Sequence, residues 1–219
     1  MKYSLLLPLI FFLACFSKDP LQGPVTSEIK KGGKWTLRIG SSPEEVYAQL
    51  QALGLEKGFD RVAVVGRTAV ATPAELPADL ATYDALTLQT TDGRLERIQF
   101  EFSGDTVSGV FAGGGRLDSV GRWPAGDVAI DRGDAVADVR DELTVILGRP
   151  EYAGYELVLP DKPLPRAYDP GMAELSEWRF VFFEDRDPPY QDRYTVRLLF
   201  EGDRLRSLQV TQQRFELVN

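Results

Sequence analysis

The chain has 219 residues, of which 43% are hydrophobic and 11% aromatic, so it has enough apolar material for a core and is not globally disordered. Its 33 acidic and 25 basic residues leave a net charge of −8, which argues against nucleic-acid binding through the phosphates. There is no histidine and a single cysteine. The lack of histidine excludes catalytic systems in which histidine activates a serine or cysteine nucleophile, and it excludes zinc sites with histidine ligands.

Residues 1–14 have the pattern of a signal peptide. Lys2 precedes an apolar stretch over residues 5–13, which is too short for a membrane span of about 20 residues. The run Phe-Leu-Ala-Cys that ends at Cys15 resembles the lipobox of bacterial lipoproteins. This resemblance implies cleavage before Cys15 and membrane attachment through lipid on its thiol. Phe16, in place of Asp, implies the outer membrane of the bacterial envelope, with the protein facing the periplasm or the cell surface. The alternative is an ordinary secretory signal.

Residues 15–33 comprise the lipidated cysteine and a predicted flexible tether. The segment after Cys15 contains two prolines and three glycines and shows no hydrophobic period. We therefore expect ordered structure to begin near Trp35.

The first half, residues 34–120, is predicted to begin with a helix. Ser42-Pro43-Glu44-Glu45 forms a capping box, and Gly54 is predicted to end the helix. Strand-like runs follow, with a hairpin signal at Asp92-Gly93. The predicted strands cover residues 61–65, 86–90, 94–100 and 107–112.

The second half, residues 121–219, repeats this order. A helix is predicted after Asp134 as N-cap, with its end at Leu147-Gly148. The predicted strands cover residues 155–159, 175–183, 194–200 and 204–210. The expected fold class is therefore α+β, with two similar halves that each pack a short helical segment on an antiparallel β-meander. The alternative is a chance likeness between two amphipathic hairpins.

This order resembles the repeat of β-lactamase-inhibitor proteins and of the small SmpA/OmlA lipoproteins of outer-membrane assembly. Their helix starts with an Ile-Gly-Met-Ser-like run and ends at Leu-Gly, and three strands follow. Residues 39–46 match the start, residues 147–150 match the end, and residues 178–180, Trp-Arg-Phe, match the aromatic strand. The resemblance implies a protein-binding role.

The acidic segment over residues 184–192 supplies the candidate metal or catalytic residues. Asp185 and Asp187 have the spacing at which a calcium-binding loop begins, although the glycine of such a loop is absent. A pair of carboxylates could also serve a hydrolase. The alternative is a solvated loop between two strands.

Residues 160–171 contain four prolines and form the predicted contact surface. A stiff, extended segment loses little entropy on docking, and Arg166 and Tyr168 are residue types that are frequent in interface hot spots. The alternative is a plain connecting loop.

These observations predict a lipid-anchored envelope protein that binds another protein and has no cofactor and no catalytic role. It could act as an assembly factor, an enzyme inhibitor or an immunity protein, and its acidic surface would suit a basic partner. The alternative function is a carboxylate-dependent hydrolase of envelope polysaccharide.

Overall fold

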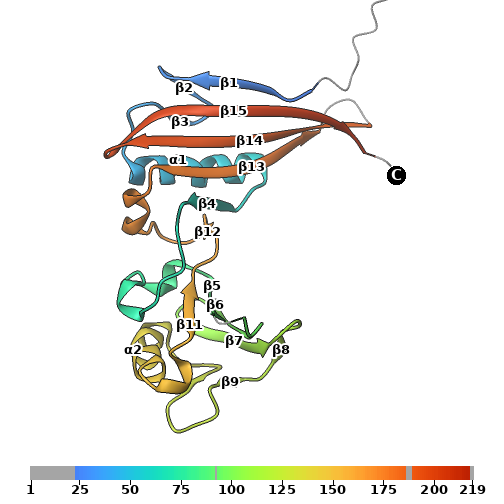
Figure 1. Ribbon diagram of the computed structural model, residues 1–219. Coiled ribbons are helices and arrows are strands. Elements are labelled where there is room, and N and C mark those ends of the chain that lie inside the picture. Colours follow the sequence, from blue (N-terminus) through green and yellow to red (C-terminus); the bar gives the residue numbers. More distant parts are fainter. Residues whose placement is uncertain (1–22, 92, 186–188, 218–219) are drawn as a thin grey trace, which may run out of the picture.

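The computed structural model describes residues 23–91, 93–185 and 189–217. In these residues the protein has the predicted α+β fold, with helices and antiparallel sheets (Figure 1). The α-helices are α1 (Pro43–Lys57) and α2 (Val136–Leu147). The 3-10 turns are η1 (Pro73–Glu75), η2 (Leu80–Thr82), η3 (Pro150–Tyr152) and η4 (Pro170–Glu174).

The larger sheet has six strands in the order β1-β15-β14-β13-β4-β12. Their bounds are β1 (Val25–Ile29), β15 (Arg204–Glu216), β14 (Tyr190–Glu201), β13 (Glu177–Asp185), β4 (Arg61–Val65) and β12 (Lys162–Pro163). Buried side chains alternate with more exposed ones along β13 and β14, so one face of the sheet covers a core and the other faces solvent.

The second sheet has five strands in the order β11-β5-β6-β7-β8. Their bounds are β11 (Tyr155–Val158), β5 (Ala85–Thr90), β6 (Arg97–Ser103), β7 (Thr106–Gly113) and β8 (Asp118–Ser119). Two short ribbons complete the strands, β2 (Gly33–Lys34) with β3 (Leu37–Arg38), and β9 (Arg122–Trp123) with β10 (Ile130–Asp131).

Two hydrophobic cores divide the molecule into two units. In the first unit, the buried face of α1 belongs to one core with the inward-facing residues of β13, β14 and β15. In the second unit, the buried face of α2 belongs to another core with residues of β5, β6 and β7. Figure 1 shows the two units at opposite ends of the molecule.

The second unit is inserted into the first. The chain leaves the first unit after β4, builds the second unit from η1 to β11, and returns at β12. The two cores therefore do not follow the predicted halves, residues 34–120 and 121–219. The helix α1 lies in the first half but packs on strands of the second half, and α2 lies in the second half but packs on strands of the first half. Hydrophobic periodicity identifies the apolar face of a helix, but the sheet that covers this face lies far away in the sequence.

The predicted tether is wrong for the part that the structure describes. Residues 25–29 form β1, which pairs with β15 from Val25 opposite Gln212 to Ile29 opposite Leu208. An edge strand is held by backbone hydrogen bonds and needs no hydrophobic period, so this sequence pattern could not reveal it. The tether residues that precede Gly23 lie outside the described residues.

The capping box at the start of α1 is confirmed, whereas Gly54 does not end the helix. Ser42 accepts from the backbone of Glu45, whose carboxylate accepts from the backbone of Ser42 at 2.8 Å. The helix continues to Gly58, whose φ of 73° ends it. Gly54 allows a close approach instead, because a Cβ there would lie 2.5 Å from the carbonyl oxygen of Phe59.

The second helix begins one residue later than predicted. Its N-cap is Ala135, and the carboxylate of Asp134 accepts from the backbone of Asp131 at 2.6 Å instead of capping α2. The predicted end at Leu147-Gly148 is confirmed.

Candidate functional site

Two predicted site residues lie outside the part of the chain that the structure describes. They are Cys15, the predicted lipidation site, and Asp187, one of the two metal candidates. The other candidate, Asp185, ends β13 and accepts a hydrogen bond of 2.7 Å from Nε2 of Gln191. In the described ranges, no three His, Cys, Asp or Glu side chains are grouped so that they could hold a metal ion. The described residues also contain no helix that is long and apolar enough to cross a membrane.

The acidic residues beside Asp185 hold parts of the first unit together. Glu184 forms an ion pair of 2.8 Å with Nζ of Lys57 at the end of α1. Asp192 is fully buried and accepts from Nε of Arg214 at 2.9 Å. Since these carboxylates join neighbouring elements, this part of the acidic segment is built into the sheet and is not a solvated loop.

Residues 160–171 run along the seam between the two units and do not project as a loop. Tyr168 is partly buried, with its ring centroid 5.5 Å from that of Tyr47 on α1. The guanidinium of Arg166 donates to the carbonyl of Phe102 in the second unit at 3.3 Å. Both predicted partner-binding residues therefore make contacts within the molecule, because a stiff, extended segment can also pack between two units.

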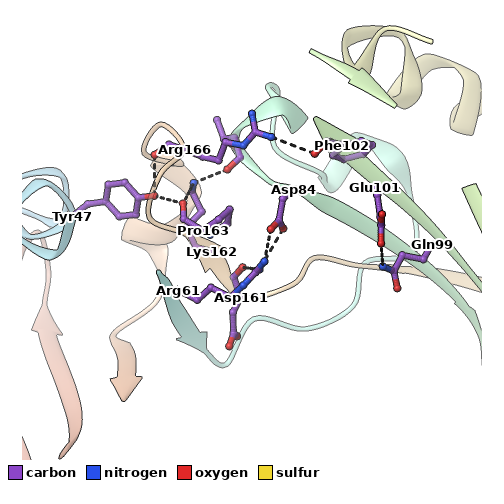
Figure 2. A network of polar contacts seen from close by, with 11 residues as sticks. Tyr47, Arg61, Asp84, Gln99, Glu101, Phe102, Asp161, Lys162, Pro163 and Arg166 are labelled. Atoms are coloured by element: carbon purple, nitrogen blue, oxygen red, sulfur yellow. Dashed lines mark hydrogen bonds and ion pairs between the residues drawn. The ribbon is translucent and has the colours of Figure 1, made fainter. Parts of the chain in front are cut away.

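Lys162 lies in this seam (Figure 2). It is the most deeply buried charged side chain there, with no exposed surface. Its Nζ donates to the carbonyl of Thr82 in the second unit at 2.6 Å and to that of Pro163 at 3.3 Å. The same nitrogen lies 5.1 Å from the ring centroid of Tyr47 and 5.2 Å from that of Tyr83. The ammonium thus lies between one aromatic ring of each unit, where cation–π attraction offsets part of its lost hydration.

Two carboxylates also join the units. Asp169, which is 3% exposed, accepts from Arg67 at 3.1 Å and from the hydroxyl of Tyr83 in the second unit. Arg61 on β4 donates through both terminal nitrogens to the carboxylate of Asp84, and Figure 2 shows this fork. These charged contacts fix the position of one unit against the other.

Beside Asp169 the seam opens into a pocket of about 470 Å³, called here the inter-unit pocket. Its volume lies in the range of small-molecule sites. Its apolar wall includes Val70, Leu76, Leu157 and Leu175, and its charged groups are Arg67, Glu75, Asp169 and Glu174. Three carboxylates and one guanidinium give this pocket a net negative charge.

The protonation equilibria of the seam follow from burial. Burial lowers the pKa of Lys162 to about 8, although Asp169 acts in the opposite direction. Burial, together with Asp169, raises the pKa of Tyr47 and of Tyr83. An amine with a lowered pKa could act as a base, but a nitrogen without solvent contact cannot reach a substrate. Lys162 therefore joins the two units through its contacts with Thr82, Tyr47 and Tyr83.

Sequence reasoning missed the residues that form the seam and the pocket. Lys162 and Asp169 lie in the proline-rich segment that the sequence singled out, but nothing there distinguished them from its surface residues. Arg67 and Tyr83 carried no signal, because their importance comes from a contact with Asp169 about a hundred residues away.

Comparison with known proteins adds no relative: no family model, curated protein or solved structure matches this chain.

Proposed function

We propose that the protein is a lipid-anchored component of the bacterial cell envelope that binds another protein through the inter-unit pocket. The observation that carries this proposal is the combination of an apolar wall and a net negative charge in one pocket. A lysine or arginine side chain of a basic partner would match both features, because its aliphatic stem packs on apolar residues while its charge meets carboxylates.

The hydrogen bonds of the pocket support binding over catalysis. Asp169 accepts hydrogen bonds from Arg67 and Tyr83. The carboxylate of Glu75 accepts from the backbone nitrogen of Thr72 at 3.2 Å and from the hydroxyl of Thr72 at 2.8 Å. Asp169 thus serves the architecture of the seam, and Glu75 caps the start of η1 in the second unit. Glu174 is exposed at the pocket and is the residue that we expect to meet the partner's cation.

A photo-crosslinker at position 174 in intact cells should identify the partner by mass spectrometry. Glu174→Lys should then abolish co-purification of that partner, because it replaces attraction by repulsion. Glu151→Lys is the matched control, since Glu151 is exposed on η3 in the second unit and does not line the pocket. Equal loss in both variants, or loss in neither, would contradict a contact at this pocket.

The anchor is tested separately at Cys15. If lipid on this thiol attaches the protein to the outer membrane, Cys15→Ser should remain a precursor or leave the membrane fraction. A variant that is processed and retained like the native protein would contradict lipid attachment.

One observation favours the alternative function, a hydrolase of envelope polysaccharide: Glu75 and Glu174 line the same pocket. Glycoside hydrolysis uses a pair of carboxyl groups. Incubation with purified peptidoglycan should release fragments if the protein is such an enzyme, and Glu75→Gln and Glu174→Gln should each stop the release. Turnover that depends on Asp185 or Asp187 would place an enzyme site on the acidic segment instead.

The duplication is also part of the proposal. Each unit combines one helix with an antiparallel meander of three consecutive strands, but the order differs from the expected repeat: α1 precedes β13–β14–β15, whereas α2 follows β5–β6–β7. A repeat of this kind would suit an assembly factor, an inhibitor or an immunity protein, and the identity of the cross-linked partner distinguishes these roles.

A further inference from the structure

The six-stranded sheet exposes apolar residues at one end of its outer face. This end is where β13 finishes, β14 begins and β15 finishes. Phe183 is 49% exposed and Leu217 is 46% exposed. Phe215 is half-buried, with its ring edge-on to Phe183 at 6.1 Å between centroids. Arg193, which is exposed, pairs with Phe183 across the strands. We call Phe183, Arg193, Phe215 and Leu217 the sheet-end patch.

The middle of β14 and β15 follows, on this face, the usual rule for a solvated sheet. Toward the middle, Thr195 lies opposite Thr211, and Arg197 lies opposite Gln209. Polar side chains of this kind are expected on the face that α1 does not cover. The rings of the sheet-end patch depart from that rule, and a grouped apolar patch on a surface indicates a contact with another molecule or with a membrane.

The described chain starts at this same end of the sheet (Figure 1). β1 begins with Val25 opposite Gln212, next to the part of β15 that carries Phe215. Cys15 precedes Val25 by ten residues, which reach about 35 Å at most when fully extended. A compact protein of 219 residues has a radius of gyration of about 17 Å and is therefore more than about 35 Å across, so the linker is no longer than the molecule itself. A lipid on Cys15 would therefore keep this end of the sheet, more than any other part, beside the bilayer.

We propose that the sheet-end patch rests on the bilayer surface and orients the anchored protein. The rings of Phe183 and Phe215 would lie at the boundary between headgroups and acyl chains, where interfacial segments bury Trp, Phe and Leu side chains. The guanidinium of Arg193 would pair with lipid phosphates, to which its planar donors are suited. This inference rests on the proposed lipid attachment at Cys15, because the short linker is what selects this end.

The test places the processed chain, residues 15–219, on vesicles by coupling the thiol of Cys15 to a maleimide lipid. Cys15 is the only cysteine, so the coupling is specific, and this form keeps every described element. The vesicles contain phosphatidylethanolamine and phosphatidylglycerol, with or without bromine on the acyl chains, which quenches tryptophan at the membrane boundary. Phe183→Trp is compared with Val145→Trp, a position on α2 that is 54% exposed.

Brominated vesicles should quench a larger fraction of the emission of Phe183→Trp than of the native protein with its three tryptophans, and Val145→Trp should show no such extra loss. Adding Phe215→Ser and Arg193→Glu to Phe183→Trp should remove the quenching. Hydrogen exchange on the coupled native protein should independently show slower exchange at the ends of β13 and β15.

No extra quenching at position 183, or equal quenching at positions 183 and 145, would overturn the proposal. Because the coupling is chemical, this result does not depend on lipidation in cells. The mass of the processed protein reports natural lipidation of Cys15 separately, so a failed anchor and a failed patch give different results.

Discussion

The inter-unit seam buries charge, whereas the sheet-end patch exposes apolar rings. Lys162 has no exposed surface and Asp169 is 3% exposed, while Phe183 is 49% exposed. Both regions depart from the usual distribution of side chains. The two regions differ in whether their unusual side chains have partners inside the molecule. The buried charged groups of the seam form hydrogen bonds there, but no described element covers the exposed rings of the patch. A buried charge with hydrogen-bond partners indicates a role in holding the fold, and an exposed apolar group that nothing covers indicates a contact with another molecule.

The sharpest way to break this comparison is to remove a carboxylate from the seam. Asp169→Ala should lower the free energy of unfolding by about 3 kcal/mol, because it leaves Arg67 and Tyr83 without their shared acceptor. Urea denaturation measures this change. Asp127→Ala, at an exposed position in the second unit, should change it by less than about 0.5 kcal/mol. Equal changes in the free energy of unfolding for Asp169→Ala and Asp127→Ala would show that the contacts of Asp169 in the seam do not stabilise the protein.

The charge of Lys162 should make stability depend on pH. Its pKa is about 8 in the folded protein, against an ordinary value of 10.5, so the unfolded chain binds more protons between these values. The free energy of unfolding of the native protein should therefore rise from pH 8 to pH 10, relative to Lys162→Met, by on the order of 1–2 kcal/mol. Above pH 10 the raised pKa of Tyr47 and of Tyr83 works in the opposite direction.

Chemical denaturation across this pH range, with the exposed Lys31→Met as control, checks the dependence on Lys162. If the free energy of unfolding changed with pH in the same way for the native protein and Lys162→Met, the buried amine would not have a lowered pKa.

Tyr168 tests how the proline-rich segment packs on the first unit, with an uncharged residue. Its ring lies against Tyr47 and Trp178, so Tyr168→Ala should lower the free energy of unfolding by about 2 kcal/mol. Tyr168→Phe keeps the ring and should stay within about 0.5 kcal/mol of the native value. If Tyr168→Ala left thermal stability unchanged but reduced partner capture, the residue would belong to an external surface, as the sequence predicted.

The smallest effect on stability is expected at the sheet-end patch. Phe183→Ser combined with Phe215→Ser should change the free energy of unfolding by less than about 1 kcal/mol, because Phe183 is half exposed and Phe215 only half-buried. Thermal unfolding followed by circular dichroism measures this. A loss as large as that of Tyr168→Ala would mean that the rings stabilise the sheet itself.

The comparison also shows where sequence reasoning succeeds. The strand predicted over residues 61–65 has those bounds in the structure, and the second helix ends at Leu147-Gly148 as predicted. The proline-rich segment is predicted to be a contact surface because a stiff segment loses little entropy on docking and because Arg166 and Tyr168 are residue types that are frequent in interface hot spots. Its burial depends on a second unit that closes over it, which no local pattern in residues 160–171 reveals.

By itself the sequence determined the α+β class, the capping box at Ser42 and Glu45, and the lipobox-like run that motivates the anchor. These features depend on residues within a few positions of one another, so propensity and periodicity carry them. Only the tertiary structure decided which helix covers which sheet, that β1 joins β15, and that Lys162 is buried. The reason is physical: Lys162 meets the carbonyl of Thr82 across 80 positions of the chain, and such contacts form only when the two units pack together.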